Sequence, residues 1–377
     1  MDLKLREDLF EYKDIFCPSN ETDRMFLLSL QDSILYHQSK NDFYRKFLNY
    51  NNFKISDIKN INDIVNIPVI HAFLFKTRDI FTIKRKNCIL TRTSSGTTGQ
   101  KSIMMFDKKT LFSNYQIITN LVNYFNLYDS EKVNYILLSP EYDKESVLGS
   151  TNSVNTLIKL APCNHIFCAI LKKNNFDILG TIRALKAFSK ENLPVRILGF
   201  PQFLNEVLEK MDEISEQPIK LHPHSMVLSG GGWKNYDDKR IDKFEFYKKI
   251  NLKLGIPLER CRDIYSSAEH PLPYIECKNH HFHEPIYSRI IIRDVKTLRP
   301  LEHGKPGFIN FISPYLLSAP ANSIIMPDLA VKYPAEKCSC GIKTPFFDIL
   351  GRSGINKSRS CAISILEILE RIKNVYN

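Results

Sequence analysis

The sequence predicts an α/β fold with a largely parallel sheet, because two kinds of segment alternate along the chain. From about residue 60, short apolar runs rich in β-branched residues alternate with longer amphipathic stretches. This alternation is typical of parallel strands joined by helices. The strand-like runs cover residues 133–139, 195–200, 224–232, 287–295 and 307–313. Helical patterns cover residues 178–189 and 237–254.

The two ends of the chain differ from this core. Residues 1–60 have the apolar spacing of helices, and the later strands lie closer together, with turns such as EHGKPG at 302–307. The closer spacing predicts an added antiparallel or barrel-like subdomain. A polar segment after Gly351 leads into a helical pattern of apolar residues: Ile365, Ile368, Leu369, Ile372 and Val375. We therefore expect one large domain over residues 1–350 and a short tail over residues 351–377.

Composition limits the possible partners and the compartment. The chain has 377 residues, of which 43% are hydrophobic and 25% charged, as in ordinary globular proteins. No apolar run is long enough to span a membrane, and the charged start lacks a secretory core, so the cytoplasm is expected. The net charge is +11, but the basic residues are dispersed and accompany no recognition motif. We therefore expect no nucleic-acid partner, whereas anionic ligands or acidic partner proteins stay open.

The cysteines indicate reduced thiols. There are nine, an odd number, in a chain without an export signal, which argues against a disulfide framework. Most are expected to be small buried residues.

A loop of small and hydroxyl residues, SSGTTGQKS, stands between two strand-like runs. Its spacing excludes the nucleotide P-loop, because Gln100 separates the last glycine from the lysine. Glycines nevertheless allow close backbone approach, and successive amides and hydroxyls form anion-binding concavities. The loop therefore predicts a phosphate site made by Ser94, Ser95, Gly96, Thr97, Thr98, Gly99 and Lys101.

This loop resembles the phosphate-binding motif of the adenylate-forming superfamily of acyl-CoA synthetases, phenylacetate-CoA ligases and acyl-protein synthetases. Four more motifs occur in the order of that superfamily: SGGGWK, YSSAEH, MPDLA and ILGRSG. The resemblance implies that Tyr265 stacks on the adenine of ATP, beside the glycine turn at Gly231. It also implies that Glu269 helps to hold Mg²⁺ and that Asp328 holds the ribose hydroxyls. Arg352 corresponds to the arginine at the hinge of the superfamily. The fold it implies is the large N-terminal domain of adenylate-forming enzymes.

The chain departs from the superfamily pattern within the YSSAEH motif. Ser266 replaces the usual glycine, and Ala268 replaces the hydroxyl residue that contacts the α-phosphate. Ser267 is the candidate substitute for that contact. Pro327 stands where glycine normally precedes the ribose aspartate.

The C-terminal region resembles one branch of the superfamily. A full-sized ligase continues with a mobile domain carrying a catalytic lysine, whereas this sequence ends 25 residues after Arg352. With Cys361 placed 16 residues from the end, it resembles the acyl-protein synthetases of fatty acid reductase complexes, known from bacterial bioluminescence systems. The resemblance implies ATP-dependent activation of a fatty acid, acyl transfer to Cys361, and delivery to an acyl reductase, with an acyl transferase as a further candidate partner. Lys101 and Glu269 complete the implied catalytic set.

Local chemistry at Cys361 agrees with a role as acyl carrier. Lys357 and Arg359 precede it, and it lies near the start of the predicted terminal helix. Cations and a helix N-terminus lower a thiol pKa and favour the nucleophilic thiolate. The alternative is a small residue at a helix start. Whether Lys357 or Arg359 replaces the mobile-domain lysine stays open.

A second cysteine group predicts a structural zinc site. Cys338 and Cys340 form a C-x-C pair, and Cys277 and His283 lie upstream, with His280 or His281 as substitutes for that histidine. Three thiolates and an imidazole satisfy tetrahedral zinc and leave no open position for catalysis. Similar elements in phenylacetate-CoA ligase-like relatives imply the same metal. The alternative is a pair of packed thiols with surface histidines.

Two other functions stay open. One is an acyl- or aryl-CoA ligase, and the other is a non-catalytic adenylate- or acyl-binding subunit. A Ser/His/Asp hydrolase is not supported, because the sequence has no G-x-S-x-G elbow.

Overall fold

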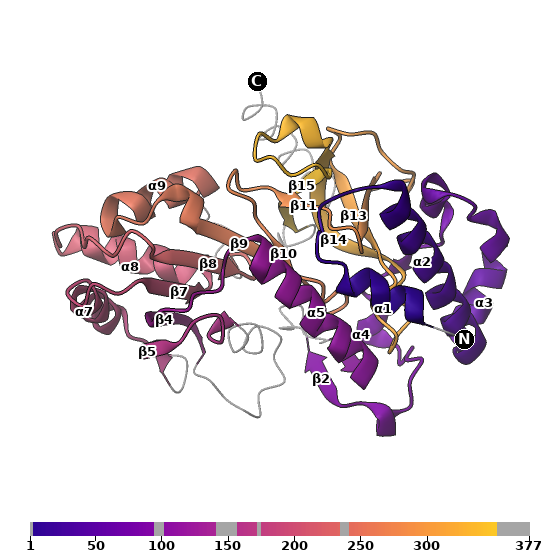
Figure 1. Cartoon of the computed structure of the whole chain (residues 1–377), viewed down its shortest axis with the longest axis horizontal. Coiled ribbons are helices and arrows are strands. Elements are labelled where there is room, and N and C mark those ends of the chain that lie inside the picture. Colours follow the sequence, from indigo (N-terminus) through magenta and orange to yellow (C-terminus); the bar gives the residue numbers. More distant parts are fainter. Residues whose placement is uncertain (1–2, 94–101, 141–156, 172–174, 234–240, 353–377) are drawn as a thin grey trace.

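The computed structural model describes residues 3–93, 102–140, 157–171, 175–233 and 241–352. The chain forms a helical N-terminal segment and two large sheets (Figure 1). Helices α1 (Lys4–Glu11), α2 (Asn20–Lys40) and α3 (Asp42–Tyr50) confirm the helical pattern expected before residue 60. Ser19 begins α2 with a capping box, and the Asn41 side chain caps α3.

The larger sheet has seven strands in the order β10-β9-β8-β7-β4-β5-β6. Its five central strands are parallel, which confirms the predicted core. The strands are β4 (Val133–Pro140), β5 (Cys163–Leu171), β6 (Asn175–Phe176), β7 (Val195–Gly199), β8 (Met226–Gly230), β9 (Cys261–Tyr265) and β10 (Tyr274–Ile275). The predicted run 224–232 gives a shorter strand, because Gly231 and Gly232 turn the chain with φ of 80° and 67°.

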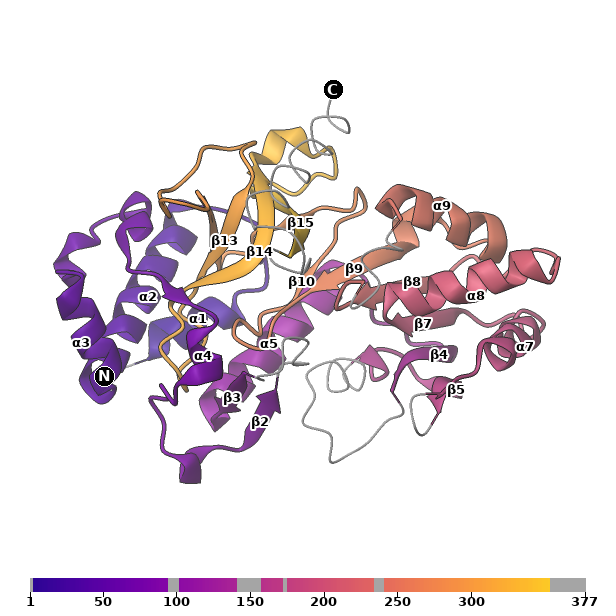
Figure 2. The same ribbon diagram turned by 180° about the vertical axis from the view of Figure 1, so that it is seen from behind.

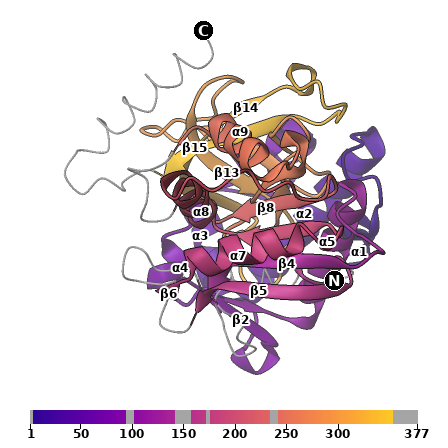
Figure 3. The same ribbon diagram turned by 90° about the vertical axis from the view of Figure 1, so that its left-hand side faces the viewer.

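Helices cover both faces of this sheet. Figure 3 shows α7 (Ile178–Phe188) lying across β4 and β5, and α8 (Pro201–Glu213) and α9 (Lys243–Leu254) continue the same layer. α5 (Lys108–Tyr124) contributes Ile117 and Leu121 to the core on the other face. The predicted helix 237–254 corresponds to α9. Residues 237–240 lie outside the described ranges, and the helix begins at Lys243.

The second sheet is antiparallel, in the order β11-β15-β14-β13-β12, with β1 parallel to β14. It confirms the added antiparallel subdomain. Its strands are β1 (Ile70–His71), β11 (Phe282–His283), β12 (Arg289–Arg293), β13 (Gly307–Ile312), β14 (Ser323–Tyr333) and β15 (Phe346–Arg352). Figure 2 shows β13, β14 and β15 beside β9 and β10, so the two sheets meet there.

A small hairpin and short helices complete the described part of the chain. The hairpin pairs β2 (Leu90–Thr93) with β3 (Ile103–Phe106), on either side of residues 94–101. The short helices are α4 (Leu74–Thr77), η1 (Ile55–Asp57), η2 (Ile61–Asn66), η3 (Arg85–Asn87), η6 (Leu258–Arg260) and η7 (Ala335–Lys337). None of the helices in the described ranges is long and apolar enough to cross a membrane.

Candidate active site at the junction of the two sheets

Two predicted nucleotide residues from different sheets lie together at the junction. The Tyr265 hydroxyl, at the carboxyl end of β9, donates to Asp328 Oδ2 on β14 at 3.4 Å. The Tyr265 ring also stacks near Phe311, with centroids 5.8 Å apart. Asp328 is paired in register with Arg352 at the end of β15, which brings the backbone of the predicted hinge arginine to the same place. Tyr265, Asp328 and Arg352 therefore converge, although the first and the last are 87 positions apart in the sequence.

The predicted magnesium residue is joined to the end of the predicted phosphate loop. Glu269 is 5% exposed, and Ser102, at the start of β3, is completely buried. The Ser102 hydroxyl donates to Glu269 Oε1. Since Ser102 directly follows residues 94–101, this contact brings the chain that leaves the loop to the YSSAEH segment. Ser267, the candidate substitute for the α-phosphate contact, accepts the His270 N–H at 2.9 Å.

His270 is a buried neighbour of this site that the sequence did not single out. Its ring stacks on Phe311 with centroids 4.3 Å apart, and its Nε2 lies 2.9 Å from the Tyr274 hydroxyl. Burial lowers the pKa of His270 to about 3, so the ring is neutral near pH 7. The only sequence signal was its position directly after Glu269.

A buried ionic cluster beneath Tyr265 was also missed. Glu276 is fully buried, and its Oε1 lies 2.6 Å from Lys243 Nζ at the start of α9. Its other oxygen accepts the Asp263 backbone N–H at 2.8 Å. Burial first, and the charge of Glu276 second, raise the pKa of the Asp263 carboxyl to about 7. Lys243 lies on α9, Asp263 on β9 and Glu276 directly after β10, so no spacing pattern could have joined them.

The predicted zinc ligands form one cluster. The ligand atoms of Cys277, His283, Cys338 and Cys340 all lie within 4.8 Å of one another. His283 Nε2 is 3.3 Å from Cys340 Sγ, while its Nδ1 lies 2.8 Å from the Thr344 carbonyl. Because a carbonyl only accepts, Nδ1 carries the proton and Nε2 faces the sulfurs as a metal ligand requires.

The other features of this cluster also fit a metal ion. Burial lowers the pKa of His283 to about 4, which keeps its ring neutral. Burial also raises the pKa of the Cys277 thiol, so a thiolate there needs a cation beside it. The two substitute histidines lie elsewhere: His281 Nδ1 pairs with Asp348 Oδ1 at 2.8 Å, and His280 occupies a turn with φ of 64°.

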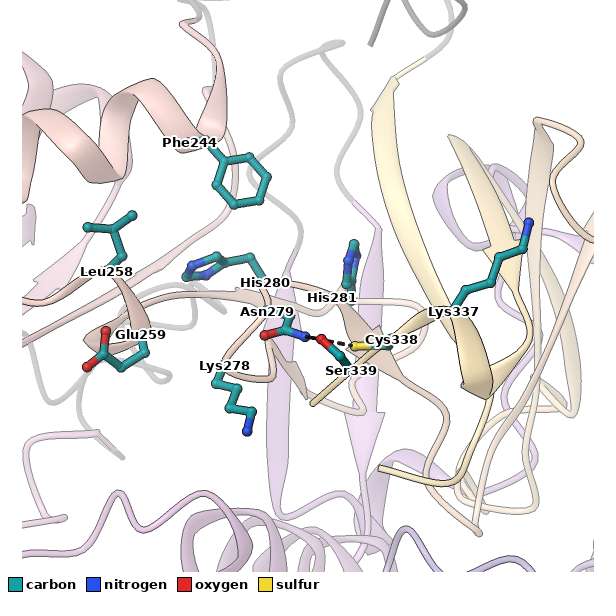
Figure 4. Close-up of a pocket in the computed structure, with 10 residues that line it drawn as sticks. All are labelled: Phe244, Leu258, Glu259, Lys278, Asn279, His280, His281, Lys337, Cys338 and Ser339. Atoms are coloured by element: carbon teal, nitrogen blue, oxygen red, sulfur yellow. Dashed lines mark hydrogen bonds between the residues drawn. The ribbon is translucent and has the colours of Figure 1, made fainter. Parts of the chain in front are cut away.

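An open pocket of about 500 Å³ borders this cluster (Figure 4). Phe244 and Leu258 line one side, and Cys338 and Ser339 line the other. Asn279, which also lines the pocket, donates to Ser339 Oγ at 3.0 Å and to Cys338 Sγ of the cysteine cluster at 3.7 Å.

Several predicted residues lie outside the described ranges. They are Ser94, Ser95, Gly96, Thr97, Thr98, Gly99, Lys101, Lys357, Arg359 and Cys361. Gly231 lies directly after β8, where its positive φ forms the predicted turn.

Comparison with known proteins identifies the family. Residues 5–370 match the family model described as "Acyl-protein synthetase, LuxE". The chain belongs to this family. It is 23% identical over 334 residues to a long-chain-fatty-acid–luciferin-component ligase of Vibrio harveyi, covering 88% of this chain and 84% of that one. The ligase of the same name from Aliivibrio fischeri is 20% identical over 349 residues, covering 91% and 88% of the two chains.

Solved structures confirm the fold. A 2-hydroxyisobutyryl-CoA ligase in complex with its acyl adenylate superposes with a TM-score of 0.66 at 15% identity, over 90% of this chain and 70% of that one. An open conformation of a 2-hydroxyisobutyryl-CoA ligase gives the same TM-score over 92% and 78% of the two chains. The predicted adenylate-forming fold and the predicted family, a family of acyl-protein ligases, are both confirmed.

Proposed function

We propose that this acyl-protein synthetase uses Mg²⁺-ATP to activate a long-chain fatty acid and transfers the acyl group to its own Cys361. One observation carries the proposal: residues from both sheets and from the end of the phosphate loop meet at one place. Tyr265 contacts Asp328 there, and Ser102 contacts Glu269. The acyl adenylate bound to the structurally similar 2-hydroxyisobutyryl-CoA ligase is consistent with this chemistry.

The first step joins two anions. A carboxylate oxygen of the fatty acid attacks the α-phosphorus of ATP, and the bond from that phosphorus to the pyrophosphate oxygen breaks. The amides and hydroxyls of residues 94–99, with Lys101, would hold the β- and γ-phosphates. Mg²⁺, when bound near Glu269, supplies positive charge to the phosphate oxygens. Tyr265 would stack on the adenine, and Asp328 would accept hydrogen bonds from the ribose hydroxyls.

The second step makes a thioester. The Cys361 thiolate attacks the acyl carbonyl carbon, a C–S bond forms, and the C–O bond to AMP breaks. Thiolates suit this step because they are strongly nucleophilic near neutral pH. The tail of residues 351–377 would carry the acyl group to an acyl reductase. An acyl transferase is a further candidate partner, which could supply the fatty acid.

The Cys277, His283, Cys338 and Cys340 cluster is proposed to hold a structural Zn²⁺. Its three sulfurs and one oriented imidazole nitrogen match the preferred donors of zinc. Four protein ligands complete a tetrahedron, so the metal would act on stability rather than on the reaction.

Intact-protein mass after incubation with Mg²⁺-ATP and a mixture of fatty acids tests the proposed activity. Wild type should gain one acyl group, whereas Cys361→Ser should gain none and still release pyrophosphate. Thioester formation on added CoA with no protein adduct would instead indicate a CoA ligase. No pyrophosphate release under any condition would indicate a non-catalytic binding subunit.

Elemental analysis of the purified protein tests the zinc proposal. Wild type should contain about one zinc per chain, and Cys338→Ser should lose most of it. Cys163→Ser is the matched control, because Cys163 is exposed on β5 and should leave the zinc content unchanged. Wild type without zinc would contradict the proposal.

A further inference from the structure

The first residue of α9 is a lysine, which is an unfavourable place for a cation. The N-terminal end of a helix carries partial positive charge, so acidic residues are preferred there. Lys243 nevertheless begins α9, and its Nζ lies 2.6 Å from Glu276 Oε1 and donates to the His280 carbonyl at 2.8 Å. These contacts join the helix to the chain beyond β10 and offset the unfavourable position.

Glu276 transmits this contact to β9. Its Oε2 accepts the Tyr247 hydroxyl at 3.0 Å and the Asp263 N–H at 2.8 Å. Its own N–H donates to the Asp263 carbonyl at 3.1 Å, and its carbonyl accepts Arg262 Nη1 at 2.8 Å. Glu276 thus holds both backbone groups of Asp263, which stands two residues before Tyr265 in the same strand.

The same contacts reach the glycine turn. The Ser229 hydroxyl, at the end of β8, donates to Asp263 Oδ1 at 3.3 Å. The Trp233 ring, just after the turn, lies 5.8 Å from the ring of Phe246 on α9. Lys243 and Glu276 are therefore linked by these contacts to two parts of the proposed adenine subsite. One part is the end of β9 at Tyr265, and the other is the turn at Gly231.

We propose that Lys243 and Glu276 are positioning residues for the nucleotide subsite, setting the ends of β8 and β9 for adenine binding. This inference rests on the proposed function. The two residues need not touch ATP, because the hydrogen bonds to Asp263 fix the strand that carries Tyr265. Glu276 also directly precedes Cys277, so the residue that holds β9 in place is the chain neighbour of a proposed zinc ligand.

The far end of α9 provides a matched control. Lys253, in its last turn and ten positions after Lys243, pairs with Asp212 on α8, and neither residue belongs to the Lys243, Glu276 and Asp263 cluster. Lys253→Met and Lys243→Met therefore each remove one ion pair from the same helix. A purely structural role would give both variants the same effect on ATP.

ATP affinity, measured by the fluorescence of Trp233, the sole tryptophan, is the main test. Lys243→Met should raise the Kd for ATP about tenfold, the usual scale of one lost charged hydrogen bond. The KM for ATP in pyrophosphate release should rise by a similar factor, with kcat within about twofold. Lys243→Arg should restore part of the affinity, and Lys253→Met should leave it unchanged.

Four outcomes separate the positioning role from the proposed activity. Equal ATP affinity in wild type, Lys243→Met and Glu276→Gln would overturn the positioning role alone. A large loss of kcat without a change in Kd or KM would overturn it as well. If wild type binds ATP but releases no pyrophosphate with any fatty acid, the proposed activity fails, and the ranking of the Kd values still judges the positioning role. No ATP binding by folded wild type would overturn both.

Discussion

Two regions of the molecule bury ionisable side chains, and they do so in opposite ways. In the helical N-terminal segment, Arg6 donates to the Pro314 carbonyl at 2.8 Å and to Ser113 Oγ at 3.0 Å, and it also reaches the Tyr315 carbonyl. Beneath Tyr265, Lys243, Glu276 and Asp263 instead form a cluster in which charged groups contact one another. The first region uses neutral acceptors, and the second uses charge.

The kind of partner indicates whether a buried ionisable group serves mainly the packing of the chain or also a functional site. The buried His37 of α2 likewise contacts the Thr82 hydroxyl and the Leu316 carbonyl. The partners of Arg6 and His37 are uncharged groups, so these contacts depend on how α1 and α2 pack against the rest of the chain. A cluster of mutually dependent charges responds when any member is changed, and such clusters gather at functional sites. Changes in the N-terminal segment should therefore alter stability, whereas changes beneath Tyr265 should also alter nucleotide binding.

Arg6→Met should produce the largest effect. It leaves the buried acceptors of Arg6 without a donor, so the free energy of unfolding should fall by about 3 kcal/mol or more. Urea denaturation measures the loss. The Kd for ATP of the protein that remains folded should match wild type, since the hydrogen-bond partners of Arg6 are not members of the cluster beneath Tyr265.

Lys109→Met is the control for this change. Lys109 and its partner Glu7 are exposed, and their atoms lie 3.7 Å apart, so removing the pair should cost less than about 0.5 kcal/mol. A similar loss in both variants would show that Arg6 contributes no more than a surface charge.

His37 should make stability depend on pH. Its Nε2 donates to the Leu316 carbonyl, and burial lowers its pKa to about 3, well below the value near 6.5 expected in the unfolded chain. A histidine with a depressed pKa contributes stability that is present above pH 6.5 and is lost as the pH falls toward 3. Between neutral pH and pH 4.5, this group should remove about 2–3 kcal/mol from the free energy of unfolding.

Unfolding measured at several pH values with His37→Gln checks this prediction. Glutamine can still donate to the Leu316 carbonyl but does not titrate, so the loss on acidification should shrink by the same amount. His224→Gln, at an exposed position, should leave the pH dependence unchanged. An unaltered pH dependence in His37→Gln would assign the acid sensitivity to other groups.

Sequence patterns predicted the parts of this protein that depend on local order. Alternating apolar runs gave the parallel core and the antiparallel subdomain, since strand and helix periodicity is a property of neighbouring residues. The motif order also named Tyr265 and Asp328, although it could not show that their side chains touch. The four proposed zinc ligands could be named together because cysteine and histidine are rare and their pairing has few solutions.

The residues that were missed depend on tertiary contacts. Ser102 reads as one more loop hydroxyl until the fold brings Glu269 to it across 167 positions. Lys243 reads as a solvated charge on a helix, which is the usual role of such a residue. Only the fold shows that its ammonium group is paired with the buried carboxylate of Glu276, which directly follows β10.

The smallest predicted effect is the coupling between Lys243 and Glu276, and it separates the two kinds of ion pair most directly. A double-mutant cycle with Lys243→Met and Glu276→Gln should give a coupling of about 1–2 kcal/mol in unfolding, because the carboxylate is buried. The same cycle in ATP affinity should also give a non-zero coupling. The exposed Lys248–Glu245 pair on the same helix has a comparable distance, 2.8 Å, and should show none within error in either measurement. Equal couplings in the two pairs would show that the burial of Glu276 adds nothing to its interaction with Lys243.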